Sequence, residues 1–176
     1  IKECDWSSDV CSSDLSLKRS ARGWENGIVI HEILPVGMLQ CNCSIFGDEI
    51  TKEAIVVDPG DDLVDIQAVL DKHALKVKAI VITHAHIDHI GGAAKLKALT
   101  GAPVMMNAND EPLYDQMDQQ AAWLRIKTPT RTDIDTKLRD GDTLRLGDCD
   151  FHAIQDRKST RLNSSHIPLS RMPSSA

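Results

Sequence analysis

The stretch KAIVITHAHIDHIGG, residues 78–92, joins a short apolar run to a polar motif with three histidines and an aspartate. The run KAIVIT at 78–83 is almost continuously apolar, which is typical of a strand buried on both faces of a sheet. THAHIDH follows at 83–89, and Gly91 and Gly92 mark a break before the next apolar segment. The stretch therefore predicts a buried strand whose carboxyl end carries the polar residues.

The motif offers four side chains that bind metal ions in proteins: His84, His86, Asp88 and His89. Histidine is the commonest ligand near neutral pH, and a carboxylate completes hard or borderline sites. In an extended segment, residues two positions apart point to the same side, so His84 and His86 can bind one ion together. We expect the motif to lie in a loop after the strand, with Asp88 and His89 turned toward a neighbouring ion. The alternative is a solvated polar turn, which this concentration of ligands disfavours.

The sequence on both sides of this stretch predicts an α/β fold. Short apolar and β-branched runs predict strands, whereas an apolar period of about 3.6 residues predicts helices. Strands are expected at 28–34, 41–46, 53–58, 78–83 and 103–106, helices at about 61–73, 93–100 and 110–124, and a hairpin at 143–154.

THAHIDH followed by two glycines, with VDPG at 57–60 one strand earlier, resembles the metallo-β-lactamase superfamily. Within it, the segment is most similar to the glyoxalase II-like group, the hydroxyacylglutathione hydrolases and their small bacterial relatives. The resemblance covers about residues 28–154. It implies an α/β fold that corresponds to the N-terminal half of an αββα sandwich.

The resemblance also implies roles for single residues. His84 and His86 would bind the first of two divalent metal ions, and Asp88 and His89 the second; zinc is expected, with iron or manganese as alternatives. Asp88 would also orient the nucleophile, which makes it the candidate catalytic residue. Asp58 is expected beneath the site, where it would orient the ligand loop without binding metal. A plain turn aspartate or a helix cap is the alternative interpretation of Asp58.

The implied reaction is metal-assisted hydrolysis, in which two ions lower the pKa of a water molecule and stabilise the oxyanion of the substrate. The most similar group implies a small-molecule thioester as substrate. Persulfide dioxygenases and β-lactamases share the fold and part of the ligand set, so both remain alternatives. A non-enzymatic metal-binding or redox module that uses Cys41 and Cys43 is another, although two small apolar residues on a core strand are the simpler interpretation.

The composition limits the other classes of function. The chain has 176 residues and a formal net charge of −6, which suits one domain and disfavours nucleic acid as a partner. No apolar run approaches the roughly 18 residues that a membrane span needs, so we expect no membrane partner. The cysteines follow no disulfide pattern, which predicts a reducing, cytoplasmic location. The oligomeric state stays open.

Both ends of the chain are rich in serine and lack helical or strand periodicity. Residues 156–166, DRKSTRLNSSH, can be encoded by a DNA string whose reverse complement encodes residues 5–15 in a shifted frame. That string is similar to a common short-read sequencing adapter. We therefore expect 1–15 and 156–176 to be non-native and a partial metallo-β-lactamase domain to span 16–155. Two disordered tails are the alternative.

A complete member of the family would supply further ligands after the predicted hairpin: a histidine for the first ion, a bridging aspartate, and a last histidine. No residue of this chain matches them. A histidine codon interrupted by the adapter would read as glutamine, so Gln155 is expected to replace the first of these ligands. The chain by itself is therefore expected to hold an incomplete site and to be inactive.

Overall fold

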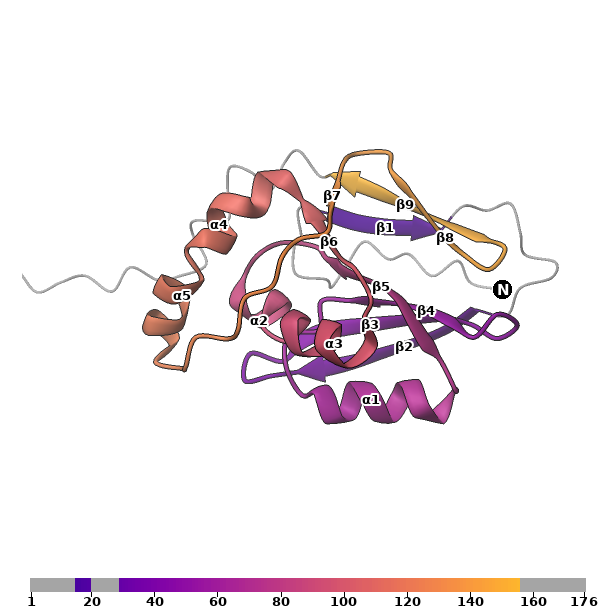
Figure 1. The fold of residues 1–176 in the computed structure, drawn as a ribbon, viewed down its shortest axis with the longest axis horizontal. Coiled ribbons are helices and arrows are strands. Elements are labelled where there is room, and N and C mark those ends of the chain that lie inside the picture. Colours follow the sequence, from indigo (N-terminus) through magenta and orange to yellow (C-terminus); the bar gives the residue numbers. More distant parts are fainter. Residues whose placement is uncertain (1–14, 20–28, 156–176) are drawn as a thin grey trace, which may run out of the picture.

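The computed structural model describes residues 15–19 and 29–155, which form two β-sheets and a set of short helices (Figure 1). The strands are β1 (Leu15–Arg19), β2 (Val29–Val36), β3 (Cys41–Asp48), β4 (Glu53–Val57), β5 (Lys76–Ile82), β6 (Val104–Asn107), β7 (Thr136–Leu138), β8 (Thr143–Leu146) and β9 (Cys149–Gln155). The helices are α1 (Leu63–Lys72), α2 (Ile87–Ile90), α3 (Ala93–Thr100), the 3-10 turn η1 (Ala108–Asp110), α4 (Glu111–Asp115) and α5 (Met117–Leu124).

The larger sheet has the order β2-β3-β4-β5-β6-β7, in which β2 to β4 are antiparallel and β4 to β7 are parallel. β5 lies inside this sheet and is buried on both faces. Ile80 and Ile82 belong to the core cluster that contains helical residues, whereas Ala79 and Val81 belong to a second cluster. This two-sided burial explains the continuous apolar run and confirms the prediction made from it.

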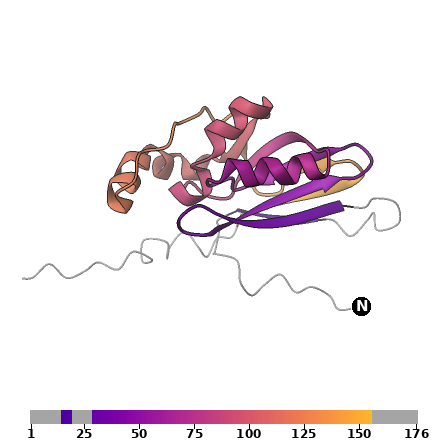
Figure 2. The same ribbon diagram turned by 90° about the horizontal axis from the view of Figure 1, so that it is seen from below.

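The smaller sheet has the order β1-β9-β8 and is antiparallel. Leu144, Leu146 and Phe151 pack with the Val81 side of the larger sheet, while the helices cover the other side, as Figure 2 shows for β2 and β3. The layers are thus helices, sheet and sheet, as expected for the N-terminal part of an αββα sandwich. None of the helices in the described ranges is long and apolar enough to cross a membrane.

Several local features differ from the sequence predictions, among them the helix predicted at 110–124, which is divided into α4 and α5. β2 continues beyond the predicted end at 34 through Pro35, because β2 is an edge strand, where a missing N–H need not break a ladder. β7 was not predicted, since its three residues carry no readable period. The helix predicted from about residue 61 begins at Leu63, because Asp62 adopts a left-handed conformation; its Oδ2 accepts a hydrogen bond from the Gly37 N–H at 2.8 Å and does not cap α1.

Of the two segments predicted to be non-native, the structure describes only Leu15, the first residue of β1. The other residues of 1–15 and all of 156–176 lie outside the described residues. The proposed origin of both segments therefore remains a prediction.

Candidate metal centre

The motif follows β5 directly. Thr83 to His86 form a loop, and Ile87–Ile90 then form the single turn of α2. The predicted loop is therefore correct for His84 and His86, whereas Asp88 and His89 lie in a short helix. The extended backbone of His86, with φ −69° and ψ 145°, makes the change of direction between the two parts.

The structure brings all four predicted ligands together. The ring of His84 lies 4.6 Å from that of His86 and 4.0 Å from that of His89, measured between centroids. Asp88 joins them, because its Oδ2 lies 3.6 Å from Nε2 of His89. His84 and His89 are buried, and Asp88 keeps a quarter of its side chain exposed. The cluster is thus enclosed by the fold and open on the side of Asp88.

Asp58, the residue after β4, lies beneath this cluster and is buried. Its Oδ1 accepts a hydrogen bond from the Thr83 N–H at 2.8 Å, and its Oδ2 accepts one from the Thr83 hydroxyl at 2.6 Å. The same Oδ2 lies 2.9 Å from Nδ1 of His89. Asp58 therefore contacts the ligand loop and one ring, which is the position expected for a residue that orients ligands.

These contacts determine which ring nitrogens face the site. A carboxylate only accepts hydrogen bonds, so Nδ1 of His89 carries the proton and Nε2 is turned toward Asp88. The Thr83 hydroxyl, which donates to Asp58, lies 3.2 Å from Nδ1 of His84 and can accept a hydrogen bond from an N–H at that position. The Nε2 atoms of His84 and His89 are therefore the ones available to a metal ion.

The two buried histidines differ in their pKa. Burial, together with smaller contributions from the neighbouring His89 and His86, lowers the pKa of His84 to about 3. For His89, burial also lowers the pKa, but the hydrogen bond to Asp58 and the charges of Asp58 and Asp88 outweigh it and raise the pKa above its ordinary value. The lowered pKa of His84 favours the neutral ring that binds a cation, whereas the raised pKa of His89 means that protons compete more strongly with a cation at this ring.

The VDPG turn packs against the backbone of the motif. A Cβ built on Gly60 would lie 1.7 Å from the carbonyl oxygen of Asp88, and one built on Gly92 would lie 2.0 Å from that of Pro59. Only glycine permits backbones to approach so closely. Gly60 and Gly92, which belong to the motifs that supported the family resemblance, therefore bring Asp58 up to the ligand loop.

Gln120 on α5 braces the ligand loop, a role that the sequence did not reveal. Its Oε1 accepts a hydrogen bond from the Ile87 N–H at 2.9 Å, and its Nε2 donates to the carbonyl oxygens of Ala85 at 3.1 Å and Leu113 at 3.0 Å. One side chain thus fixes the backbone on both sides of His86. Nothing in the sequence distinguishes Gln120 from the neighbouring Gln119.

We expect Gln120→Leu to weaken metal binding about tenfold, within the range usual for residues that support ligands. The leucine fills a similar volume but leaves the Ile87 N–H and the Ala85 carbonyl without their partner. The measurement is a competition titration of the 176-residue chain against a coloured chelator. Gln119→Leu, at an exposed position of the same helix, is the matched control. Equal affinities of the two variants would contradict a bracing role.

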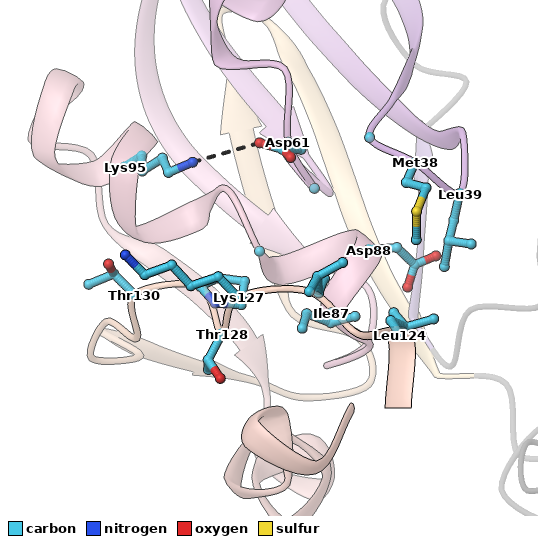
Figure 3. A pocket seen from close by; sticks show the side chains of 15 residues that line it. Met38, Leu39, Asp61, Ile87, Asp88, Lys95, Leu124, Lys127, Thr128 and Thr130 are labelled. Atoms are coloured by element: carbon cyan, nitrogen blue, oxygen red, sulfur yellow. Dashed lines mark ion pairs between the residues drawn. The ribbon is translucent and has the colours of Figure 1, made fainter. Parts of the chain in front are cut away.

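A pocket of about 360 Å³ opens beside the cluster (Figure 3). Asp88 lies at the end of this pocket with Met38 and Leu39, and Lys95 and Lys127 lie toward the other end. The exposed face of Asp88 therefore looks into a space with apolar side chains at one end and with Lys127 and the Lys95–Asp61 ion pair toward the other.

The donor set fits a divalent transition-metal ion. Three imidazoles and a carboxylate suit zinc, iron and manganese, whereas magnesium and calcium prefer sites made of oxygen ligands alone. The buried Asp58 behind His89 supplies the carboxylate partner that ligating histidines usually have. His84, His86, Asp88 and His89 would hold such an ion or ions.

A parallel strand that delivers clustered histidines and an aspartate to its carboxyl end defines a metal-binding α/β protein. Comparison with known proteins agrees: residues 36–160 match the Metallo-beta-lactamase superfamily. The chain belongs to this superfamily, which confirms the resemblance drawn from THAHIDH and VDPG.

Individual relatives indicate which group within the superfamily this chain resembles. The chain is 37% identical to an uncharacterized protein of Aquifex aeolicus over 127 residues, 72% of this chain and 59% of the relative. It is 32% identical to the hydroxyacylglutathione hydrolase GloC of Haemophilus influenzae over 130 residues, 70% of this chain and 58% of the relative. These matches support a glyoxalase II-like group. The chain spans less than two thirds of the length of these relatives.

Solved structures show the same fold. TTHA1623, determined in a di-iron-bound form, has a TM-score of 0.57 and 30% identity, over 64% of this chain and 56% of that protein. The B3 metallo-β-lactamase BLEG-1 has a TM-score of 0.58 and 24% identity, over 70% and 59%. The second likeness concerns the fold alone.

Proposed function

We propose that this chain carries part of the metal centre of a thioester hydrolase of the glyoxalase II-like kind. The observation that carries the proposal is the convergence of His84, His86, Asp88 and His89 above the buried carboxylate of Asp58. The relative named as a hydroxyacylglutathione hydrolase supports a thioester substrate. Zinc is the proposed metal, with iron as the alternative that the di-iron form of TTHA1623 supports.

The metal ions and the residues of the chain would have separate roles in the reaction. Bound metal ions would polarise the thioester carbonyl and increase the acidity of water. Asp88, partly exposed toward the pocket, would hold and orient the attacking water. The apolar end of the pocket would receive the acyl chain, and Lys127 at the other end would attract an anionic thiol carrier. Asp58 and Thr83 would keep His84 and His89 in the orientation that ligation needs.

The proposal is tested by comparing three substrates on protein loaded with zinc or iron. We expect cleavage of a hydroxyacylglutathione, followed through the loss of thioester absorbance, with no β-lactam hydrolysis and no oxygen uptake with a glutathione persulfide. The hydroxyacylglutathione hydrolase GloC, of which this chain matches 58%, is assayed beside the 176-residue chain, which we expect to bind metal but to turn over far more slowly. Oxygen uptake or β-lactam cleavage in place of thioester hydrolysis would overturn the proposal.

The same proposal includes the cellular location of the protein and its binding partner. We propose a cytoplasmic location, supported by Cys41, Cys43 and Cys149, none of which forms a disulfide within the described residues. The partner proposed is a small-molecule thioester, with neither nucleic acid nor a membrane surface involved; the acidic net charge of −6 supports this.

A further inference from the structure

Cys41 lies beside the candidate metal centre. Within the described ranges, its Sγ, a carboxylate oxygen of Asp88 and a ring nitrogen of His89 form a group whose atoms all lie within 4.8 Å of one another. Cys41 is buried, with 7% of the residue exposed. The sequence interpretation of Cys41 as a buried strand residue is therefore correct, but its burial is against ligands rather than against apolar core alone.

The start of β3 explains this position. A turn in which the Gln40 N–H donates to the Gly37 carbonyl at 3.1 Å leads the chain into the strand. Cys41, Cys43 and Ile45 are buried residues on the same side of β3, and all three belong to the core cluster that includes α2. Cys41 is at the end of this row, where β3 meets Asp88 and His89.

The other two cysteines are placed differently. Cys43 is fully buried, and burial raises the pKa of its thiol. Cys149 belongs to the second core cluster, on the opposite face of the larger sheet. Among the cysteines that the structure describes, Cys41 alone takes part in a group of converging donors.

We propose that Cys41 is a third protein ligand, through sulfur, of the ion held by Asp88 and His89. The inference rests on the proposed metal centre and adds a donor to it. A zinc ion bonds nitrogen, oxygen and sulfur at about 2.0–2.3 Å, so these three donors need only a small inward movement to bind one ion. A sulfur, a nitrogen and an oxygen are a mixed set suited to zinc, cobalt, cadmium and iron, and poorly suited to manganese or magnesium.

A sulfur ligand makes the affinities for different metal ions differ more than histidine and carboxylate ligands alone do. We expect Cys41→Ala to raise the dissociation constant for Cd²⁺ at least about tenfold, while that for Mn²⁺ changes by less than about twofold. Cys149→Ala, which removes a buried thiol far from the donors, should change neither constant. Circular dichroism of each variant shows whether the substitution has altered the fold.

Two further measurements begin with the unmodified chain. The reduced 176-residue chain titrated with Co²⁺ should develop a near-ultraviolet sulfur-to-cobalt charge-transfer band. Under the same conditions Cd²⁺ should slow the alkylation of Cys41 by iodoacetamide, read out on its peptide by mass spectrometry, and leave Cys149 unaffected. The band should be lost in Cys41→Ala and retained in Cys149→Ala.

The outcomes separate this inference from the proposed function. Uptake of Co²⁺ without the charge-transfer band, or without protection of Cys41, would overturn the cysteine ligand while leaving a metal centre of histidines and carboxylate. Failure to take up any of the metals would overturn both. A band that survives Cys41→Ala would assign the sulfur to another cysteine and equally overturn the inference.

Discussion

A single methyl group added at Gly60 or Gly92 is expected to destabilise the protein by more than about 3 kcal/mol, the range of severe overpacking. The added carbon of Gly60→Ala would lie 1.7 Å from the Asp88 carbonyl oxygen, and that of Gly92→Ala would lie 2.0 Å from the Pro59 carbonyl oxygen. Both obstacles are backbone atoms. Relief therefore requires the VDPG turn and the ligand loop to separate, which would also displace Asp58 from His89.

The matched control is Gly101→Ala. Gly101 has φ +72°, but a Cβ there would meet nothing within 4 Å. This variant tests the left-handed conformation without a clash and should destabilise by only about 1–2 kcal/mol. Urea unfolding followed by circular dichroism measures all three variants. If Gly60→Ala were no less stable than Gly101→Ala, the close packing of the two backbones would be wrong.

Replacing the Asp58 carboxylate by an amide is expected to weaken metal binding about 10- to 100-fold. Asp58→Asn keeps the shape of the side chain, but Asp58 accepts from the Thr83 N–H, the Thr83 hydroxyl and His89 Nδ1. An asparagine has one oxygen to accept these hydrogen bonds, and its NH₂ group faces at least one donor. His89 then loses the partner that holds its Nε2 toward Asp88.

Affinities for Zn²⁺ are measured by chelator competition, as for the glutamine variants. Asp61→Asn is the control, because Asp61 is close in sequence and its exposed carboxylate pairs with Lys95 at 3.7 Å. We expect the control to bind Zn²⁺ as the unchanged chain does. A loss in Asp61→Asn as large as in Asp58→Asn would indicate a general effect of negative charge rather than a specific role of Asp58.

The sheet was predictable where burial leaves a pattern in the sequence. β5 was predicted because both of its faces are buried, and β2 to β4 because their β-branched runs end at turn residues. The one-turn helix α2 was not predicted, since Asp88 and His89 were assigned to a loop by their chemistry. A helix of four residues has too little sequence to show a period.

The part of the site that could be predicted is the part formed by one contiguous stretch of sequence. His84, His86, Asp88 and His89 fall within one short motif, so their residue types alone indicated that they act together. Gln120 reaches the loop across 33 residues of sequence, and Cys41 reaches it from another strand. Contacts of this kind depend on the order of the strands in the sheet. The residue types alone do not predict that order.

The short separation along the chain between Asp58 and its partners has a consequence for folding. Thr83 and His89 follow Asp58 by 25 and 31 residues, whereas β1 pairs with β9 through Leu15 and Gln155. The entropy lost in closing a loop grows with its length, and folding is faster where contacts are local. The ligand loop can therefore assemble as soon as β4 and β5 meet, before the two ends of the described chain come together.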